Sequence, residues 1–419
     1  MPKAQFYESL KREVARIDEA KVSKRNERII EGFSNDPSPK ALIQGKQFTI
    51  FNSNDYLGLR HNQTLKEAEH TASMQYGTGP GAVRFISGSL KIHRDLEKKI
   101  AAFHGRDDAM IFSSAFATNM AVLFCLLKGQ NKDALVSGNT LVISDELNHR
   151  SIIDGIRVAG MESTQKAVFH HFDSENLGQL LEQNAGKFDR VIVVTDGVFS
   201  MLGEYQDLSK IRAVIDRFDA SYSEGVLLVV DDAHGVGAFG PTGRGTEEVS
   251  GAKADVLIGT MGKAFGADGG YVTGDQVVMD YLRESAATYI YSNSISPGTA
   301  GAAYAAISMM QGEEGSQLLR KLETSVKYFK EKMLAAGFSF AADSIHPIQP
   351  LLIGDTEKVK ALTNALYDAG YLVTNLNYPV VPKGKDEIRV QISASHTQQD
   401  LDSFIAAAIL AGKATGVLA

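Results

Sequence analysis

The feature that most constrains the fold of this 419-residue chain is a regular alternation between about residues 110 and 275. Short apolar runs rich in Val, Ile and Leu are separated there by segments of helical length, such as 208–218. The runs are 109–112, 141–143, 191–194, 226–230 and 256–258. Apolar strands that alternate with helices are typical of a parallel sheet covered on both faces. The sequence therefore predicts an α/β fold with a mostly parallel sheet between helices.

Each of these five runs ends in polar or small residues. The ends are Ser113-Ser114, Ser144-Asp145, Thr195-Asp196, Asp231-Asp232 and Gly259-Thr260. In open α/β sheets, ligands bind beyond the carboxyl ends of the strands. We therefore expect these hydroxyls and carboxylates to form the rim of an active site.

The segments on either side of the alternation predict two further regions. Apolar residues at helical spacing predict an amphipathic helix over 4–32. After Pro297 we expect helices over 298–311, 316–335 and 357–369, strands over 348–353 and 388–392, and a last helix capped by Thr397 with Asp400 in its first turn. The predicted division is an N-terminal helix and arm (1–50), a large domain (51–297) and a smaller C-terminal α+β domain (298–419).

Charge and cysteine content exclude several classes of protein. With 43 basic and 50 acidic residues the formal charge is −7, and the absence of a basic block argues against a nucleic-acid partner. Cys125 is the only cysteine, which excludes intrachain disulfides and thiolate metal sites, and its apolar neighbours predict a buried thiol. The N-terminus is charged and the apolar stretches are short, so we expect a cytoplasmic protein without a membrane span.

Two glycine-rich motifs look functional but lack their required context. Gly235 to Gly240 matches G-x-G-x-x-G, but Pro241 and further glycines follow where a dinucleotide-binding helix must begin. Gly262-Lys263 resembles the end of a Walker A loop, but Ala264 stands where a magnesium-binding Ser or Thr is needed. Neither a G-x-S-x-G nor an H-E-x-x-H pattern occurs, so we predict no serine hydrolase and no metal site.

The most informative residues are Asp231, His234 and Lys263, which follow consecutive predicted strands. A pyridine-aldehyde cofactor needs a lysine amine to hold its aldehyde and a carboxylate to keep its ring nitrogen protonated. Lys263 can supply the first and Asp231 the second. The glycines around Lys263 allow close approach of the backbone, Thr260 offers a hydroxyl to a phosphate, and His234 could donate to the ring oxygen.

At these residues the sequence resembles a known family, the α-oxoamine synthases among the fold-type I pyridoxal-phosphate enzymes. The resemblance extends from about Phe6 to the C-terminus. It is carried by Asn54-Asp-Tyr-Leu-Gly58, Val83-Arg-Phe-Ile-Ser-Gly88, Ser113-Ser-Ala-Phe-Ala-Thr-Asn119, Ser144-Asp-Glu-Leu-Asn-His149, Thr195-Asp-Gly-Val-Phe-Ser200, Asp231-Asp-Ala-His234, Gly259-Thr-Met-Gly-Lys263 and Tyr291-Ser-Asn-Ser294. It implies a large domain with a seven-stranded sheet, a smaller C-terminal domain and bound pyridoxal 5'-phosphate (PLP).

The resemblance also implies roles for individual residues. Lys263 would be the Schiff-base lysine and proton shuttle, Asp231 would pair with the pyridinium nitrogen, and His149 would stack on the ring. His234 and Ser200 would hold the ring hydroxyl. The phosphate would be held by Ala115, Phe116 and Thr260, and by Ser294 from the partner subunit of a homodimer. Asn54 and Arg389 would hold the carboxylate of the amino acid, since a guanidinium fork recognises a carboxylate in a fixed plane.

The implied reaction is a Claisen-type condensation of an amino acid with an acyl-CoA, which releases CoA. The segments 374–384 and 388–396 are most similar to those of glycine C-acetyltransferases (2-amino-3-ketobutyrate CoA ligases), which implies glycine and acetyl-CoA. The loop after Lys263, in contrast, has the length found in serine palmitoyltransferases and 8-amino-7-oxononanoate synthases, which use longer acyl thioesters. The amino acid (glycine, serine or alanine), the acyl length and decarboxylation of the product therefore stay open. An aminotransferase and a non-catalytic binding protein remain alternatives from other classes.

Overall fold

The computed structural model describes residues 2–19, 23–25, 27–129, 133–378 and 380–419. The chain divides into two compact units, Met1–Thr49 and Ile50–Ala419, which we describe separately. The first unit contains helix α1 (Pro2–Glu19) and the antiparallel strands β1 (Gly32–Phe33), β2 (Ala41–Ile43) and β3 (Lys46–Ile50). Helix α1 is therefore shorter than the helix predicted over 4–32. Residues 20–22 and 26 of that prediction lie outside the described residues, and 27–31 are not helical.

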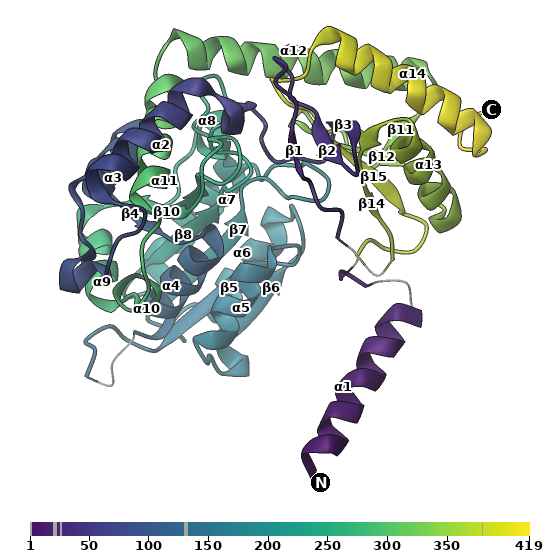
Figure 1. Cartoon of the computed structure of the whole chain (residues 1–419). Coiled ribbons are helices and arrows are strands. Elements are labelled where there is room, and N and C mark those ends of the chain that lie inside the picture. Colours follow the sequence, from purple (N-terminus) through teal and green to yellow (C-terminus); the bar gives the residue numbers. More distant parts are fainter. Residues whose placement is uncertain (1, 20–22, 26, 130–132, 379) are drawn as a thin grey trace. The chain divides into compact units, whose positions relative to one another are not determined.

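A seven-stranded sheet forms the centre of the second unit (Figure 1). Its strands are β4 (Asp108–Phe112), β5 (Thr140–Asp145), β6 (Lys166–Phe169), β7 (Arg190–Asp196), β8 (Val226–Asp231), β9 (Val256–Thr260) and β10 (Gly270–Gly274). Their order is β4-β10-β9-β8-β7-β5-β6, and only β10 is antiparallel to its neighbours. The predicted parallel sheet and all five predicted strands are confirmed, whereas β6 and β10 were not predicted.

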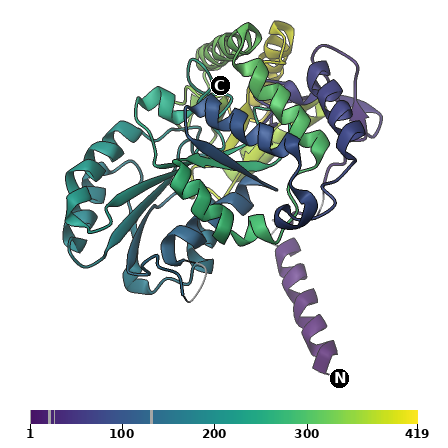
Figure 2. The ribbon, with the colours of Figure 1, turned by 90° about the vertical axis from the view of Figure 1, so that its left-hand side faces the viewer.

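Helices cover both faces of this sheet (Figures 1 and 2). Alternate residues of a strand point to opposite faces, so Val142 packs with α4 (Ala115–Lys128) and α5 (Arg150–Val158), whereas Leu141 and Ile143 pack with α6 (Ser174–Asn184) and α7 (Leu208–Phe218). The thiol of Cys125 lies within the first of these clusters, as predicted. Further helices are α2 (Gln63–Tyr76), α3 (Lys91–His104), α8 (Thr246–Ser250), α9 (Gln276–Ser285), α10 (Ala287–Ile290) and α11 (Pro297–Met310).

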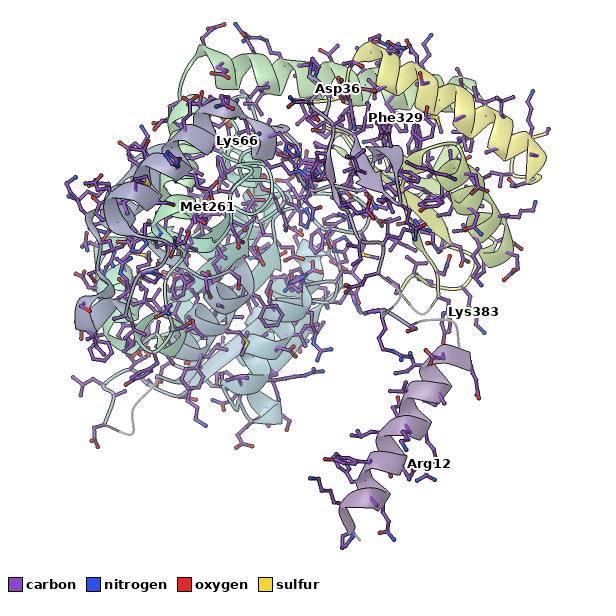
Figure 3. All side chains as sticks on the ribbon, viewed as in Figure 1. Arg12, Asp36, Lys66, Met261, Phe329 and Lys383 are labelled. Carbon is purple, nitrogen blue, oxygen red and sulfur yellow. The ribbon has the colours of Figure 1, made fainter. Side chains whose placement is uncertain are left out.

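The C-terminal part is a smaller α+β region. Its antiparallel sheet has the order β11-β12-β15-β14. The strands of this sheet are β11 (Ser339–Phe340), β12 (Ile348–Leu352), β14 (Thr374–Leu376) and β15 (Glu387–Gln391). The region also contains the short strand β13 (Tyr371–Leu372) and the helices α12 (Glu313–Ala335), α13 (Thr356–Asp368) and α14 (Gln398–Ala414). Phe329 of α12 (Figure 3) is buried against Phe404 of α14, with ring centroids 5.8 Å apart. Thr397 caps α14 reciprocally with Asp400, as predicted.

The strands place their polar ends at one edge of the central sheet. Strands β5, β7, β8 and β9 are parallel, and β4 points the same way because both β4 and β9 are antiparallel to β10. Phe112 and Thr260 therefore both lie opposite Gly270. The expected rim at the carboxyl edge is thus formed. Within the described ranges, every helix is too short or too polar to cross a bilayer.

Candidate active site

One pocket lies at the carboxyl edge of the sheet, with an empty volume of about 340 Å³ that is partly open to solvent. Its lining includes seven residues that the sequence predicts for the site: Ala115, Phe116, His149, Ser200, Asp231, His234 and Lys263. The other lining residues are Ser151, Asp196, Val198 and Ala233. The structure thus gathers the ends of β7 and β8, the segments that follow β5 and β9, and the start of α4 in one pocket.

Lys263 lies in the loop between β9 and β10, and its amine is shielded from solvent by the pocket walls. Burial lowers the pKa of this amine to about 8, although the carboxylates of Asp231 and Asp196 oppose the shift; Arg389 adds to it. An ordinary lysine has a pKa near 10.4 and is almost fully protonated at neutral pH. The lowered pKa gives Lys263 a substantial neutral fraction, which is the form that attacks an aldehyde or takes up a proton.

Asp231 is the last residue of β8, and its carboxylate is buried and well supplied with donors. The side-chain nitrogen of Asn119 on α4 lies 2.5 Å from Asp231 Oδ2, and the backbone N–H of Ala233 donates to Oδ1 at 3.1 Å. Hydrogen bonds to a carboxylate favour its charged form. Asp231 is therefore held in the wall of the pocket by two hydrogen-bond donors.

His149 caps the N-terminus of α5 and presents its ring to the pocket. Its backbone N–H donates to Asp196 Oδ2 at 3.0 Å, and its Nδ1 lies 2.7 Å from the hydroxyl of Ser151. Its ring lies nearly perpendicular to that of Phe116, with centroids 6.5 Å apart. The pKa of His149 is lowered mainly by burial, with the charge of Lys263 adding and that of Asp231 opposing. A neutral imidazole is the consequence.

A hydrogen-bonded chain connects His234 to the predicted carboxylate-binding pair. His234 Nδ1 lies 2.8 Å from the hydroxyl of Tyr56, which is 3.3 Å from Asn54 Oδ1. Arg389 on β15 approaches the same Asn54 oxygen to 3.3 Å. Burial lowers the pKa of His234 well below its ordinary value, so its ring is neutral at physiological pH. Asn54 and Arg389, which the sequence predicts to hold the carboxylate of an amino acid, thus lie within hydrogen-bond distance of each other, and that role stays a prediction.

The start of α4 offers unpaired backbone donors to the pocket. Ser114 is the N-cap, and its hydroxyl accepts from the N–H of Ala117 at 3.1 Å. Ala115 and Phe116 are the two residues before Ala117 at the start of the helix, and both line the pocket. The first N–H groups of a helix have no partner within the helix, and together with the helix dipole they bind anions such as phosphate.

Two predicted phosphate ligands are placed differently from the rest. The hydroxyl of Thr260 donates to the carbonyl of Gly269 at 2.8 Å and accepts from Gly262 at 3.1 Å, so its single donor is used within its own loop. The hydroxyl of Ser294 is buried and has no hydrogen-bond partner among the described residues. Neither residue lines the pocket, and the roles expected for them stay predictions.

Four site residues were not assigned a role from the sequence. Tyr56, Asn119, Ser151 and Asp196 all bond to predicted site residues. Asp196 carried a signal, because it ends a predicted strand beside Asp231. Tyr56 and Asn119 lie inside motifs that resemble the family, but only the folded chain reveals that their side chains face His234 and Asp231.

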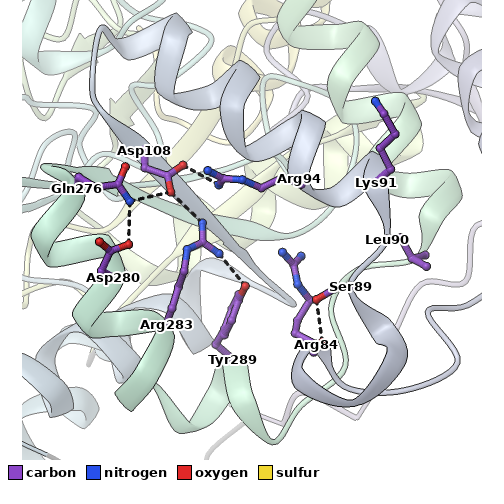
Figure 4. Close-up of a pocket in the computed structure, with 10 residues that line it drawn as sticks. All are labelled: Arg84, Ser89, Leu90, Lys91, Arg94, Asp108, Gln276, Asp280, Arg283 and Tyr289. Atoms are coloured by element: carbon purple, nitrogen blue, oxygen red, sulfur yellow. Dashed lines mark hydrogen bonds and ion pairs between the residues drawn. The ribbon is translucent and has the colours of Figure 1, made fainter.

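A second hollow lies between α3 and α9 and is rich in charge (Figure 4). Glu97 of α3 is fully buried and forms ion pairs with three residues that line the hollow, Arg84, Arg94 and Arg283. Asp108 pairs with Arg94 at 2.7 Å and with Arg283 at 3.2 Å. These charges largely compensate one another, and the network joins α3, β4 and α9.

Comparison with known proteins places this site in a family. The family model for aminotransferase class I and II matches residues 46–407. The chain belongs to this family. Human mitochondrial 2-amino-3-ketobutyrate coenzyme A ligase is 38% identical over 94% of this chain and 89% of its own length. An 8-amino-7-oxononanoate synthase from Petrotoga mobilis is 36% identical over 99% of this chain and its whole length.

Solved structures share the fold of this chain. A serine palmitoyltransferase variant from S. paucimobilis with a bound PLP–myriocin adduct matches with a TM-score of 0.86 and 25% identity, over 99% of each chain. A structure of SPT with PLP matches with a TM-score of 0.87, 25% identity and the same coverage. The resemblance to the PLP-dependent α-oxoamine synthases, which condense an amino acid with an acyl thioester, and the predicted fold class are confirmed.

The residues of the pocket fit PLP by their own chemistry. The site offers an amine with a lowered pKa, a buried carboxylate that accepts a hydrogen bond from Asn119 and a helix N-terminus for a phosphate. These are the three groups that PLP needs for its aldehyde, its ring nitrogen and its phosphate.

Proposed function

We propose that this chain condenses glycine with an acyl-CoA, releases CoA and gives a 2-amino-3-keto acid or, after loss of CO₂, a 2-amino ketone. The observation that carries the proposal is the pocket in which Lys263, Asp231 and His149 meet beside the Arg389–Asn54 pair. Identity of 38% to the human ligase supports glycine as the amino acid and a short acyl group.

PLP, when bound, supplies a cationic ring that withdraws electrons from the α-carbon of the amino acid. Asp231 keeps the ring nitrogen protonated, and the N–H groups of Ala115 and Phe116 bind the phosphate. Ser200 and His234 line the same pocket and would contact the ring hydroxyl. The ring of His149 would stack on the cofactor ring and exclude water from the face that it covers.

The substrate's carboxylate would bind Arg389 and Asn54, which orients the α-hydrogen toward Lys263. The neutral amine of Lys263 takes that proton, and the electron pair of the C–H bond forms a new bond to the carbonyl carbon of the thioester. The C–S bond breaks, its electron pair leaves with CoA as a thiolate, and the thiolate is protonated from solvent. Where the product keeps its carboxylate, the proton on Lys263 leaves to solvent; where CO₂ is lost, Lys263 delivers that proton to the α-carbon.

A longer acyl thioester is the second candidate substrate. Identity of 36% over the whole length of the Petrotoga synthase and the loop length after Lys263 favour it. We also propose a homodimer in which Ser294 of one subunit reaches the phosphate of the other, as the family resemblance implies.

The test is CoA release measured with glycine, serine and alanine against acyl-CoAs of increasing length. We expect glycine to give the highest rate, and Lys263→Ala to abolish both turnover and the visible absorbance of the cofactor. Lys210→Ala, which changes an exposed lysine on α7, is the matched control. Amino-group transfer without any need for acyl-CoA would support an aminotransferase and overturn the proposal.

A further inference from the structure

A buried polar chain runs along the wall of the pocket from the carboxylate of Asp231 to the ring of His149. Asn119 Nδ2 lies 2.5 Å from Asp231 Oδ2 and 3.0 Å from Ser151 Oγ. Ser151 Oγ lies 2.7 Å from His149 Nδ1. Asn119 and Ser151 are both buried, so neither can exchange these partners for water.

The direction of each hydrogen bond follows from the donors that these groups possess. A carboxylate only accepts, so the amide nitrogen of Asn119 must face Asp231 and donate to it. The second hydrogen of the same nitrogen then donates to Ser151 Oγ. At the other end, the backbone N–H of Ser151 lies 3.2 Å from His149 Nδ1 and cannot accept, so Nδ1 carries a lone pair.

The hydroxyl of Ser151 must therefore use its only hydrogen to donate to His149 Nδ1. It receives the hydrogen of Asn119 on a lone pair, so the hydroxyl is satisfied in both directions. With two donors directed at Nδ1, the ring proton of a neutral His149 resides on Nε2. Protonation of Nδ1 would bring it against the backbone N–H of Ser151, which cannot turn away.

We propose that Ser151 and Asn119 are positioning residues that hold His149 as the neutral tautomer with its proton on Nε2, which leaves this N–H as a donor to the pocket. This deepens the proposed function and rests on it for the role of that donor: an oxygen of the bound substrate would accept it. The titratable groups around the ring are Asp231 of β8, Asp196 of β7 and Lys263. The lowered pKa of His149 agrees with a ring that stays uncharged.

The test is the ¹⁵N spectrum of cofactor-free protein labelled at histidine, recorded as a function of pH. The signals of His149 are assigned by their loss in His149→Gln. We expect the wild-type protein to show a protonated Nε2 and an unprotonated Nδ1 throughout the neutral range. A wild-type spectrum with the proton on Nδ1 overturns the proposal without any further variant.

Three variants separate positioning from general packing. Ser151→Ala removes one of the two donors, so we expect a mixture of tautomers, a higher pKa of His149 and a loss of kcat on the order of tenfold. Ser151→Thr keeps the hydroxyl and should restore the single tautomer. Ser285→Ala removes another buried helical hydroxyl and should leave the spectrum of His149 unchanged. An unaltered tautomer and pKa in Ser151→Ala would contradict the proposal.

The spectrum and the condensation assay fail independently. A protein with the expected tautomer that condenses no amino acid with any acyl-CoA refutes the proposed function and leaves the tautomer assignment standing. A protein that condenses its substrates but carries the proton on Nδ1 refutes the positioning role alone.

Discussion

The carboxylates of Asp196 and Asp231 end the neighbouring parallel strands β7 and β8 and are partners in register. Both side chains are buried. Burial raises the pKa of Asp196 well above its ordinary value, and the charge of Asp231 adds to the effect. Asp231 receives hydrogen bonds from Asn119 and from a backbone N–H. Since two adjacent buried carboxylates do not both ionise readily, the raised pKa of Asp196 makes it the member of the pair to which we assign a proton.

This assignment predicts opposite outcomes for two isosteric substitutions. Asp196→Asn keeps an oxygen that can accept the N–H of His149 and removes no charge, so we expect kcat/KM to fall by no more than a few-fold. Asp231→Asn removes the charge that would stabilise the protonated ring, and we expect a loss on the order of 100-fold or more. The measurement is kcat/KM for both variants at neutral pH and saturating PLP. Equal losses in the two variants would show that Asp196 is also ionised.

The pKa of Lys263, about 8, predicts how the rate of PLP attachment to cofactor-free protein depends on pH. The protonated amine cannot attack an aldehyde, so the rate should rise as pH increases through about 8 and level off above it. Arg389 contributes to the lowered pKa by repelling the ammonium form, so Arg389→Gln should move the midpoint to higher pH. Stopped-flow absorbance across the pH range measures both midpoints. A midpoint unchanged by Arg389→Gln would mean that this repulsion is screened.

Much of the fold was predictable because its strands are buried on both faces. Strands β7 and β8 appear in the sequence as uninterrupted apolar runs, and both were found within two residues of their ends. Strand β10 was missed because it begins and ends with glycine and carries a threonine. Helix α1 was predicted too long. Its apolar residues are exposed within its own unit, so no packing contact fixes the residue at which the helix ends.

The chemistry of the site was predictable where the type of a residue and its position after a strand are enough to indicate its role. A lysine and an aspartate that follow consecutive strands point to an aldehyde cofactor by residue type and position alone. The partners of these groups come from distant segments, such as Asn119, which lies 112 residues before Asp231. Thr260 shows what sequence position leaves out: it predicts a phosphate ligand, whereas only the folded chain reveals that the hydroxyl of Thr260 donates to the carbonyl of Gly269.

A substitution at Gly270 tests whether the start of α4 binds the phosphate. A Cβ at this position would lie 2.3 Å from the nitrogen of Ala115 and 2.4 Å from the carbonyl carbon of Ser114. Because both neighbours are backbone atoms, Gly270→Ala must displace the first turn of α4 and with it the two N–H groups that would bind the phosphate. We expect the Kd for PLP to rise on the order of tenfold, a loss of about 1.4 kcal/mol.

Gly138→Ala is the control, because a Cβ there meets nothing closer than 3.9 Å. Titration of PLP into cofactor-free protein, followed by fluorescence, measures both variants. Unchanged affinity in Gly270→Ala, with α4 intact by hydrogen exchange, would contradict the assignment of the phosphate to this helix end.

His171 predicts how the stability of the folded chain depends on pH away from the active site. Burial alone would lower the pKa of His171, but the carboxylates of Asp145 and Glu204 raise it to about 9. Nδ1 of this ring lies 3.1 Å from Asp145 Oδ1. Since the pKa is higher in the folded than in the unfolded chain, the ion pair stabilises the fold fully below about pH 6.5 and the effect is lost as pH rises through about 9.

A shift of this size corresponds to a stabilisation of about 3 kcal/mol at acidic pH. The free energy of unfolding of His171→Gln should therefore lie below that of the wild-type protein by up to this amount near pH 6, and the gap should narrow toward pH 10. Denaturant titrations at fixed protein concentration measure the gap at each pH. His170→Gln changes the exposed neighbouring histidine and should differ from the wild-type protein by less than about 0.5 kcal/mol. A gap for His171→Gln that stays constant with pH would show that packing of the ring, rather than its charge, stabilises this part of the sheet.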